Sequence, residues 1–229
     1  MAELYLQHKK HYVAVDCIIF GFDMQELKLL CIKRDFEPQK GQWSLMGGFL
    51  EEDEDTDAAA ERVLNELTGL QGIYLEQLQS YGNVSRDPAG RVVSIAYYAL
   101  IDSVKFDREI SRNFHARWFT LSDLPELIFD HEQMVDKAIK RLRRRCRFQP
   151  VGFELLPEKF TLPQLQNLYE QIFGTKFDKR NFRKKILSFD ILQKLEEKDK
   201  DGSKRGAFYY SFDHVRYSEL MNNGFNFEI

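Results

Sequence analysis

Hydrophobic residues in the first half of the chain gather in short runs typical of β-strands. Residues 12–22 (YVAVDCIIFGF) and 27–34 (LKLLCIKR) are such runs, and the short polar turn between them predicts a hairpin. Residues 72–82 and 91–103 repeat the pattern around residues 86–90 (RDPAG), whose Asp, Pro and Gly favour a type I turn. We therefore predict a mixed β-sheet in this half of the chain.

The first helical pattern lies within residues 47–70 (GGFLEEDEDTDAAAERVLNELTGL). Its apolar residues recur at spacings of three and four, so they share one helix face: Ala59, Val63, Leu67 and Leu70. Thr56 precedes this face and is the expected N-cap. The pattern predicts a helix whose apolar face is buried.

Helical periodicity dominates the second half. Residues 130–146 predict a long helix capped by Asp130, with Gln133 in the capping-box position and a basic outer face. Its inner face is apolar: Val135, Ala138, Ile139, Leu142 and Cys146. Residues 149–160 (QPVGFELLPEKF) follow as an expected linker.

Two shorter helices and a hairpin are expected after the linker. Thr161 and Gln164 suit a capping box for a helix that ends at Gly174, and Asp178 begins a second helix with a basic outer face. Residues 190–197 and 207–213 predict a strand pair, with Asp201–Gly202 favouring a tight turn between them. The order helix, short turn, basic helix and hairpin is typical of a winged helix-turn-helix that binds DNA.

Composition restricts the class of protein. The 229 residues are 43% hydrophobic and 30% charged, as in globular proteins. The sequence has neither an apolar run of about 20 residues nor an apolar N-terminal segment, so we expect a cytoplasmic protein without a membrane partner. Cys17, Cys31 and Cys146 are far apart and form no CxxC pair, which favours reduced thiols over a disulfide or zinc site.

Charge is divided unevenly along the chain. Residues 137–205 contain 19 Lys and Arg against 9 Asp and Glu, a net charge of +10, whereas the remaining residues carry −13. This polarity indicates a polyanionic partner for the basic segment, although solvated helix faces would produce the same pattern.

Residues 48–70 resemble the Nudix box. The matching positions are Gly48, Glu54, Arg62, Glu66 and Gly69, followed by Leu70, at every spacing of that motif. In the Nudix family, glutamates on this loop and helix hold magnesium against a diphosphate, because Mg²⁺ requires hard oxygen ligands. Here Val63 and Leu67 replace two of them, on a face that residue 66 would share, so the resemblance implies the fold without efficient hydrolysis, metal or cofactor. Arg62 and Glu66 also suit an ordinary i,i+4 ion pair.

A degenerate Nudix box before a winged helix resembles the Nudix-related transcriptional regulators. Segments such as WSLMGGF, FTLPQLQNLYE and DKRNFRK look closest to a Bacteroidetes branch that includes arabinose-responsive regulators. The resemblance implies an α+β chain with a Nudix-like mixed-sheet domain at 1–148 and a winged helix at 149–229. It also implies a homodimeric repressor that binds double-stranded operator DNA and a small effector, preferably L-arabinose or another pentose.

Other interpretations stay open at this point. The effector of this family can be ADP-ribose, which would make the protein a regulator of NAD metabolism. The chain could also be a Nudix hydrolase with residual activity and an added interaction domain, or a module whose basic face binds RNA or a protein. Val63 and Leu67 disfavour the hydrolase, and the ordered helix–helix–hairpin pattern disfavours the module.

The candidate effector site lies beside the box. Asp16 is the most informative residue, because a carboxylate in an apolar strand needs a partner, and a sugar hydroxyl or a structural group could supply it. The expected effector-binding residues are Asp16, Phe20, Lys33, Arg34, Trp43, Leu45, Gly47, Gly48 and Tyr97. The expected DNA-binding residues are Thr161, Gln164, Lys179, Arg180, Asn181, Arg183, Lys184, Lys200, Lys204 and Arg205. Of the latter, Arg180, Asn181 and Arg183 are assigned to the bases and Lys200, Lys204 and Arg205 mainly to phosphates.

Overall fold

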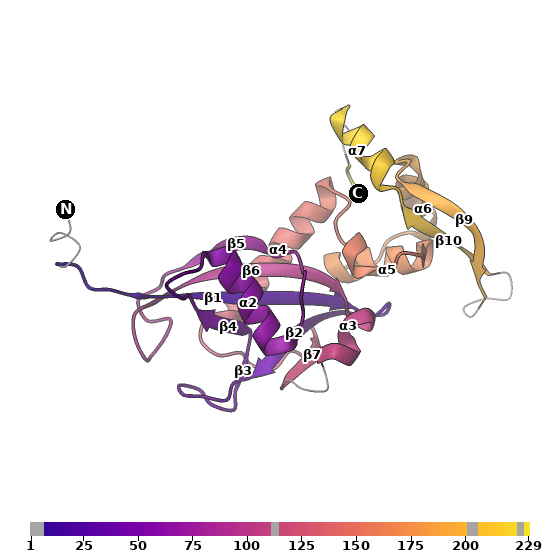
Figure 1. Ribbon diagram of the computed structural model, residues 1–229. Coiled ribbons are helices and arrows are strands. Elements are labelled where there is room, and N and C mark those ends of the chain that lie inside the picture. Colours follow the sequence, from indigo (N-terminus) through magenta and orange to yellow (C-terminus); the bar gives the residue numbers. More distant parts are fainter. Residues whose placement is uncertain (1–6, 111–114, 201–205, 224–226) are drawn as a thin grey trace.

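The chain folds into a sheet domain followed by a smaller domain of helices and a hairpin (Figure 1). The computed structural model describes residues 7–110, 115–200, 206–223 and 227–229. The predicted α+β architecture, with a mixed-sheet domain before a winged helix, is present. The part of the chain that the structure describes contains no helix long and apolar enough to cross a membrane.

A seven-stranded mixed sheet forms the first domain, in the order β3-β2-β1-β6-β5, with β4 on β1 and β7 on β2. β1 (Tyr12–Phe22) and β6 (Val92–Asp102) are parallel, whereas the other pairs are antiparallel. Both predicted hairpins, β1–β2 and β5–β6, are confirmed. The remaining strands are β2 (Leu27–Lys33), β3 (Trp43–Ser44), β4 (Met46–Phe49), β5 (Glu76–Tyr81) and β7 (Ala116–Thr120).

Side chains of β1 alternate between the two faces of the sheet. Val15 and Cys17 join one apolar cluster with α2 (Thr56–Thr68), whereas Ile18 and Phe20 join another with α4 (His131–Phe148). Figure 1 shows these helices on opposite sides of the sheet, with α3 (Ser103–Ile110) after β6. Asp16, at an even position, therefore lies on the face that α4 covers.

The predicted helix α2 is confirmed, but the prediction that Thr56 is its N-cap was wrong. Asp55 caps the helix, because its carboxylate accepts the backbone N–H groups of Asp57 and Ala58. Thr56 is the first helical residue, and its hydroxyl instead accepts a hydrogen bond from Tyr97. The predicted apolar face is buried except for Leu67, which is partly buried.

The second domain has the predicted winged-helix order. α5 (Leu162–Phe173) begins at the Thr161–Gln164 capping box and ends at Gly174, which adopts a φ of 67°. The capped α6 (Lys179–Ser188) follows, and β9 (Leu192–Asp199) pairs with β10 (Ala207–Phe212). Further elements are β8 (Phe160–Thr161), which adds a third strand on β10, and α7 (His214–Asn222).

Residues 149–160, the expected linker, pack at the junction of the two domains. They contain a 3-10 helix, η1 (Phe153–Leu155), and bury Leu155 and Leu156 in a cluster that extends from Ile18 of β1 to Phe227. The two domains also share hydrogen bonds, since the Asn167 amide of α5 donates to the carbonyls of Met24 and Gln25. The apolar residues of this segment are therefore explained by their packing at the junction between the domains.

Candidate functional site

A network of buried charges surrounds Asp16, which is only 5% exposed. The Ser94 hydroxyl donates to its carboxylate at 2.5 Å, and Arg86 Nη2 lies 3.4 Å from the same oxygen, Oδ2. Arg86 also donates through Nε and Nη2 to both oxygens of Asp130, at 3.0 and 2.8 Å. Burial lowers the pKa of Arg86, but its bonds to the two carboxylates raise the pKa overall, so the guanidinium stays charged.

His131, the first residue of α4, completes this network. Its Nδ1 accepts the backbone N–H of Leu45 at 3.2 Å, so in the neutral ring Nε2 carries the proton and faces Asp16 Oδ1 at 3.5 Å. Burial lowers the pKa of His131, and the Asp16 carboxylate offsets only part of that effect. The imidazole is therefore neutral at pH 7.

A small cavity of about 70 Å³ opens beside Asp16. Its walls include four of the predicted effector-binding residues: Asp16, Arg34, Gly47 and Gly48. Gly47 lies opposite Asp16 in the β1–β4 pair, and a Cβ at this position would collide with the Asp16 carboxylate. Glycine is thus required for the carboxylate to reach the cavity.

Aromatic rings hold Arg34 at the cavity mouth. Its guanidinium lies 3.8 Å above the Phe36 ring and 5.6 Å from the Phe129 ring, and its Nε donates to the carbonyls of Phe36 and Pro38. Phe36 and Phe49, half exposed, border the same opening. The mouth therefore combines a fixed cation with apolar rings.

The other predicted effector-binding residues lie away from the cavity. Phe20 and Leu45 are fully buried, and Tyr97 points to the α2 side of the sheet, where its hydroxyl bonds to Thr56 and Asp57. Lys33 and Trp43 pair between β2 and β3, with the amine 5.8 Å from the indole ring. Because side chains alternate along a strand, Phe20 and Leu45 point into the core, whereas Lys33 and Trp43 lie at the β2–β3 edge of the sheet.

Four residues of the network were missed from the sequence: Arg86, Ser94, Asp130 and His131. Asp130 had been predicted to cap α4 with Gln133, but its side chain makes no capping bond because Arg86 binds both carboxylate oxygens. The signal available for Arg86 was that it is the one cation in the predicted turn at 86–90.

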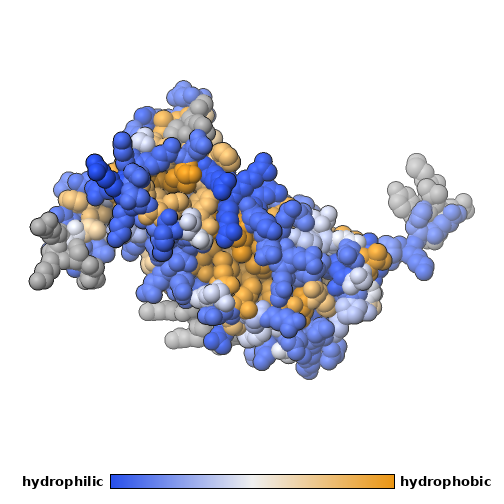
Figure 2. All heavy atoms as spheres, turned by 180° about the vertical axis from the view of Figure 1, so that it is seen from behind, coloured by the Kyte–Doolittle hydropathy of each residue, from blue (hydrophilic) through white to orange (hydrophobic). Residues whose placement is uncertain are grey.

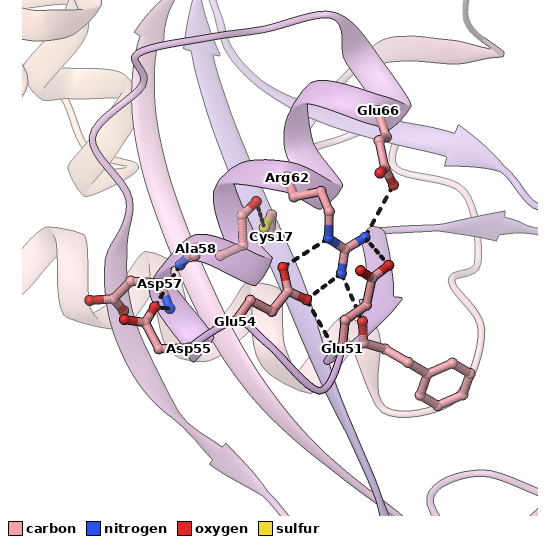
Figure 3. Close-up of polar contacts among 10 residues, drawn as sticks. Cys17, Glu51, Glu54, Asp55, Asp57, Ala58, Arg62 and Glu66 are labelled. Carbon is pink, nitrogen blue, oxygen red and sulfur yellow. Dashed lines mark hydrogen bonds and ion pairs between the residues drawn. The ribbon is translucent and has the colours of Figure 1, made fainter.

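The box glutamates surround Arg62 (Figure 3). Arg62 donates through Nε and Nη2 to Glu54 at 2.9 and 2.6 Å, through Nη1 to Glu66 at 3.2 Å, and through Nη2 to the Phe49 carbonyl. Glu51 adds a longer ion pair at 3.6 Å. The hydrogen bond from Arg62 lowers the pKa of Glu54 to about 2, so this carboxylate is ionised and committed to the guanidinium.

These residues do not fit magnesium. On the α2 face where a metal site would need carboxylates, Val63 is buried against Gly48 and Leu67 is partly buried, which leaves only Glu66 exposed. Within the described parts of the chain, no group of three or more His, Cys, Asp and Glu residues is arranged to hold a metal ion. The box forms the expected loop and helix, but the carboxylate oxygens of Glu54 and Glu66 bind Arg62.

The second domain presents the predicted basic surface. Lys179, Arg180, Asn181, Arg183 and Lys184 of α6 are all exposed, while Phe182 and Ile186 are buried beneath them. Lys200 is exposed near the hairpin tip, whereas Lys204 and Arg205 lie outside the described residues. Thr161 is buried, and its backbone N–H and hydroxyl both donate to the side-chain carbonyl of Gln164 in the capping box.

Both parts of the chain are similar to known protein families. Family models match residues 10–142 as a NUDIX domain and residues 152–212 as an NrtR DNA-binding winged helix domain. The ADPR responsive transcriptional repressor NtrR of Acinetobacter baylyi is 37% identical over 219 residues, covering 94% of this chain and 85% of that protein.

Two solved structures from Shewanella oneidensis are also similar. NrtR complexed with a 27mer DNA is 32% identical with a TM-score of 0.80, covering 90% of this chain and 95% of the other. The NUDIX domain of NrtR complexed with ADP ribose is 34% identical with a TM-score of 0.54, covering 62% and 99%.

Proposed function

The chain belongs to the family of regulators that join a Nudix domain to an NrtR-type winged helix, and we propose that it is an ADP-ribose-responsive repressor. It binds operator DNA as a homodimer and releases it when ADP-ribose enters the cavity beside Asp16. The Nudix domain binds this ligand without hydrolysing it, because Val63 and Leu67 replace two of the box carboxylates and Glu54 is bonded to Arg62. L-arabinose, the effector expected from the sequence, is not supported, since the relatives' names specify ADP-ribose.

One observation carries the proposal: α4 joins the cavity to the DNA-binding domain. Its first residue, His131, and the preceding Asp130 belong to the buried network. At its other end, Leu142 and Cys146 share a core with α5, and Arg143 Nε donates to the Ile172 carbonyl at 2.7 Å. A displacement of α4 at the cavity therefore reaches the helices of the winged domain.

The size of the cavity supports a change of shape on binding. Pockets for ligands of this size span about 300–1,000 Å³, whereas this cavity measures about 70 Å³. Arg34 and Arg86 lie on its walls, and we propose that ADP-ribose enlarges it by displacing one or both. Because Arg86 holds Asp130 at the start of α4, opening the cavity loosens the helix that supports the winged domain.

Calorimetric titration of the full chain tests the effector assignment. ADP-ribose should bind, and L-arabinose and AMP should bind much more weakly. The Asp16→Asn variant should weaken binding of ADP-ribose, whereas Asp123→Asn, which alters an exposed carboxylate near β7, should not. Binding of arabinose in preference to ADP-ribose would overturn the assignment.

The same titrations test the route through α4. Asp130→Asn should leave DNA binding and ADP-ribose binding measurable but reduce the effect of each ligand on the other. Asp136→Asn is the matched control, because Asp136 is an exposed acid on the same helix. Equal coupling in both variants would rule out the Arg86–Asp130 contact as the connection.

A further inference from the structure

The exposed side of α4 carries a row of cations, which we call the α4 ridge: Lys137, Lys140, Arg141, Arg144 and Arg147. Their spacings of three and four place them along one side of the helix, and all five are exposed. The structure, over the residues it describes, records no ion pair for any member of the ridge. By contrast, Arg143 and Arg145, which point inward from the same helix, both have bonded partners.

Helix stability does not explain the ridge. Lys137 and Arg141 are four residues apart, as are Lys140 and Arg144, and like charges at this spacing repel. The helix dipole favours cations only in the last turn, which accounts for Arg147 but for none of the earlier members. Two exposed acids, Glu132 and Asp136, lie in the first part of the helix, but from Lys137 to Phe148 every charged residue is a cation.

The ridge ends beside the DNA-binding domain. The Arg147 carbonyl accepts the backbone N–H of Ile229 at 3.3 Å, and its guanidinium lies 5.9 Å from the Phe173 ring of α5. Ile229 forms part of the wall of a hollow of about 750 Å³, whose other side is α6 with Lys184 and Lys185. Figure 2 shows the face on which α4 lies, with an apolar hollow between the two lobes bordered by hydrophilic side chains.

We propose that the α4 ridge binds the phosphate backbone of DNA beside the segment that α6 reads. The inference rests on the proposed function, since it requires a duplex on the winged domain. Charge complementarity selects this occupant: the helix of 18 residues is about 27 Å long, and a duplex carries a negative charge about every 1.7 Å along its axis. The ridge adds affinity without base preference.

Salt-dependent DNA binding tests this assignment. The probes are a duplex selected by the protein from a random library and a scrambled duplex of equal length. The ridge variant K137Q/K140Q/R141Q is compared with K9Q/K10Q/K40Q, which removes three exposed cations from the sheet domain and has the same net charge. The slope of log K against log salt changes by about 0.9 for each phosphate contact.

The ridge variant should lose between about one and three units of salt slope on both duplexes, while the control keeps the wild-type slope. An unchanged slope, or equal changes in the two variants, would overturn the proposal. If the ridge variant had an unchanged salt slope but a different oligomeric mass in solution, the ridge would be a contact with a second copy of the chain. That result would also overturn the proposal. Failure of the proposed function is distinct, because the wild-type protein would then show no preference for the selected duplex.

Discussion

Replacing Arg86 with methionine should destabilise the protein far more than an ordinary surface substitution. The side chain is 3% exposed and bonds to two carboxylates that are themselves nearly buried, Asp16 and Asp130. Breaking a buried ion pair by removing one partner costs about 3–5 kcal/mol, because the remaining charge is left without compensation. Here two carboxylates are left, so we expect a loss near the upper end of that range.

Urea unfolding of Arg86→Met and Arg91→Met provides the comparison. Arg91 lies in the same loop, but its bonds go to the carbonyls of Gly82 and Asn83, so its loss should cost only about 1 kcal/mol. Adding Asp130→Asn to Arg86→Met should recover part of the loss, giving a coupling energy of about 1–3 kcal/mol. Equal costs for the two arginine variants, or strictly additive effects in the double variant, would refute the description of Arg86 as the buried cation of this network.

Acid should destabilise the protein through His131, because burial lowers the pKa of this residue in the folded state. Its contribution to the free energy of unfolding is fully present above about pH 6.5 and is lost below that pH, by up to about 1.4 kcal/mol per pH unit. A stability profile of His131→Gln as steep as that of the wild type would contradict this. Mg²⁺-dependent hydrolysis of ADP-ribose should be negligible and unaffected by Glu66→Gln; robust turnover abolished by that substitution would show a working metal site. In DNA binding, Arg183→Ala should cost about 1–3 kcal/mol and relax base preference, whereas Lys200→Ala should weaken all duplexes alike and lower the salt slope by about one unit; identical behaviour would remove the division between α6 and the hairpin.

Local sequence patterns predicted most of the fold. The capping box at Thr161 and Gln164, the helix start at Asp178 and the strand pair after α6 depend on interactions within a few residues, and all are present. The burial of the 149–160 segment was not predicted, because its apolar residues pack against partners from the sheet domain, which local patterns do not specify. The Thr56 cap failed for a local reason, since Asp55, one residue earlier, accepts the backbone N–H groups of Asp57 and Ala58.

The candidate site was less predictable. Asp16 was identified as a carboxylate in an apolar strand and Gly47 from its place beside the box, and the structure brings them together. Arg86 and Asp130 are 44 residues apart in the chain, and their contact depends on how the loop after β5 meets α4. Local rules assigned Asp130 to a helix cap, whereas the buried arginine is the stronger partner for a carboxylate.

The release of DNA by ADP-ribose tests the central claim most directly. A duplex selected from a random library is bound to the full chain, and its dissociation constant is measured with increasing ADP-ribose and, separately, L-arabinose. ADP-ribose should weaken DNA binding by about 5–150-fold, and DNA should weaken ADP-ribose binding by the same factor. An unchanged DNA affinity at saturating ADP-ribose, or release by L-arabinose alone, would contradict the account.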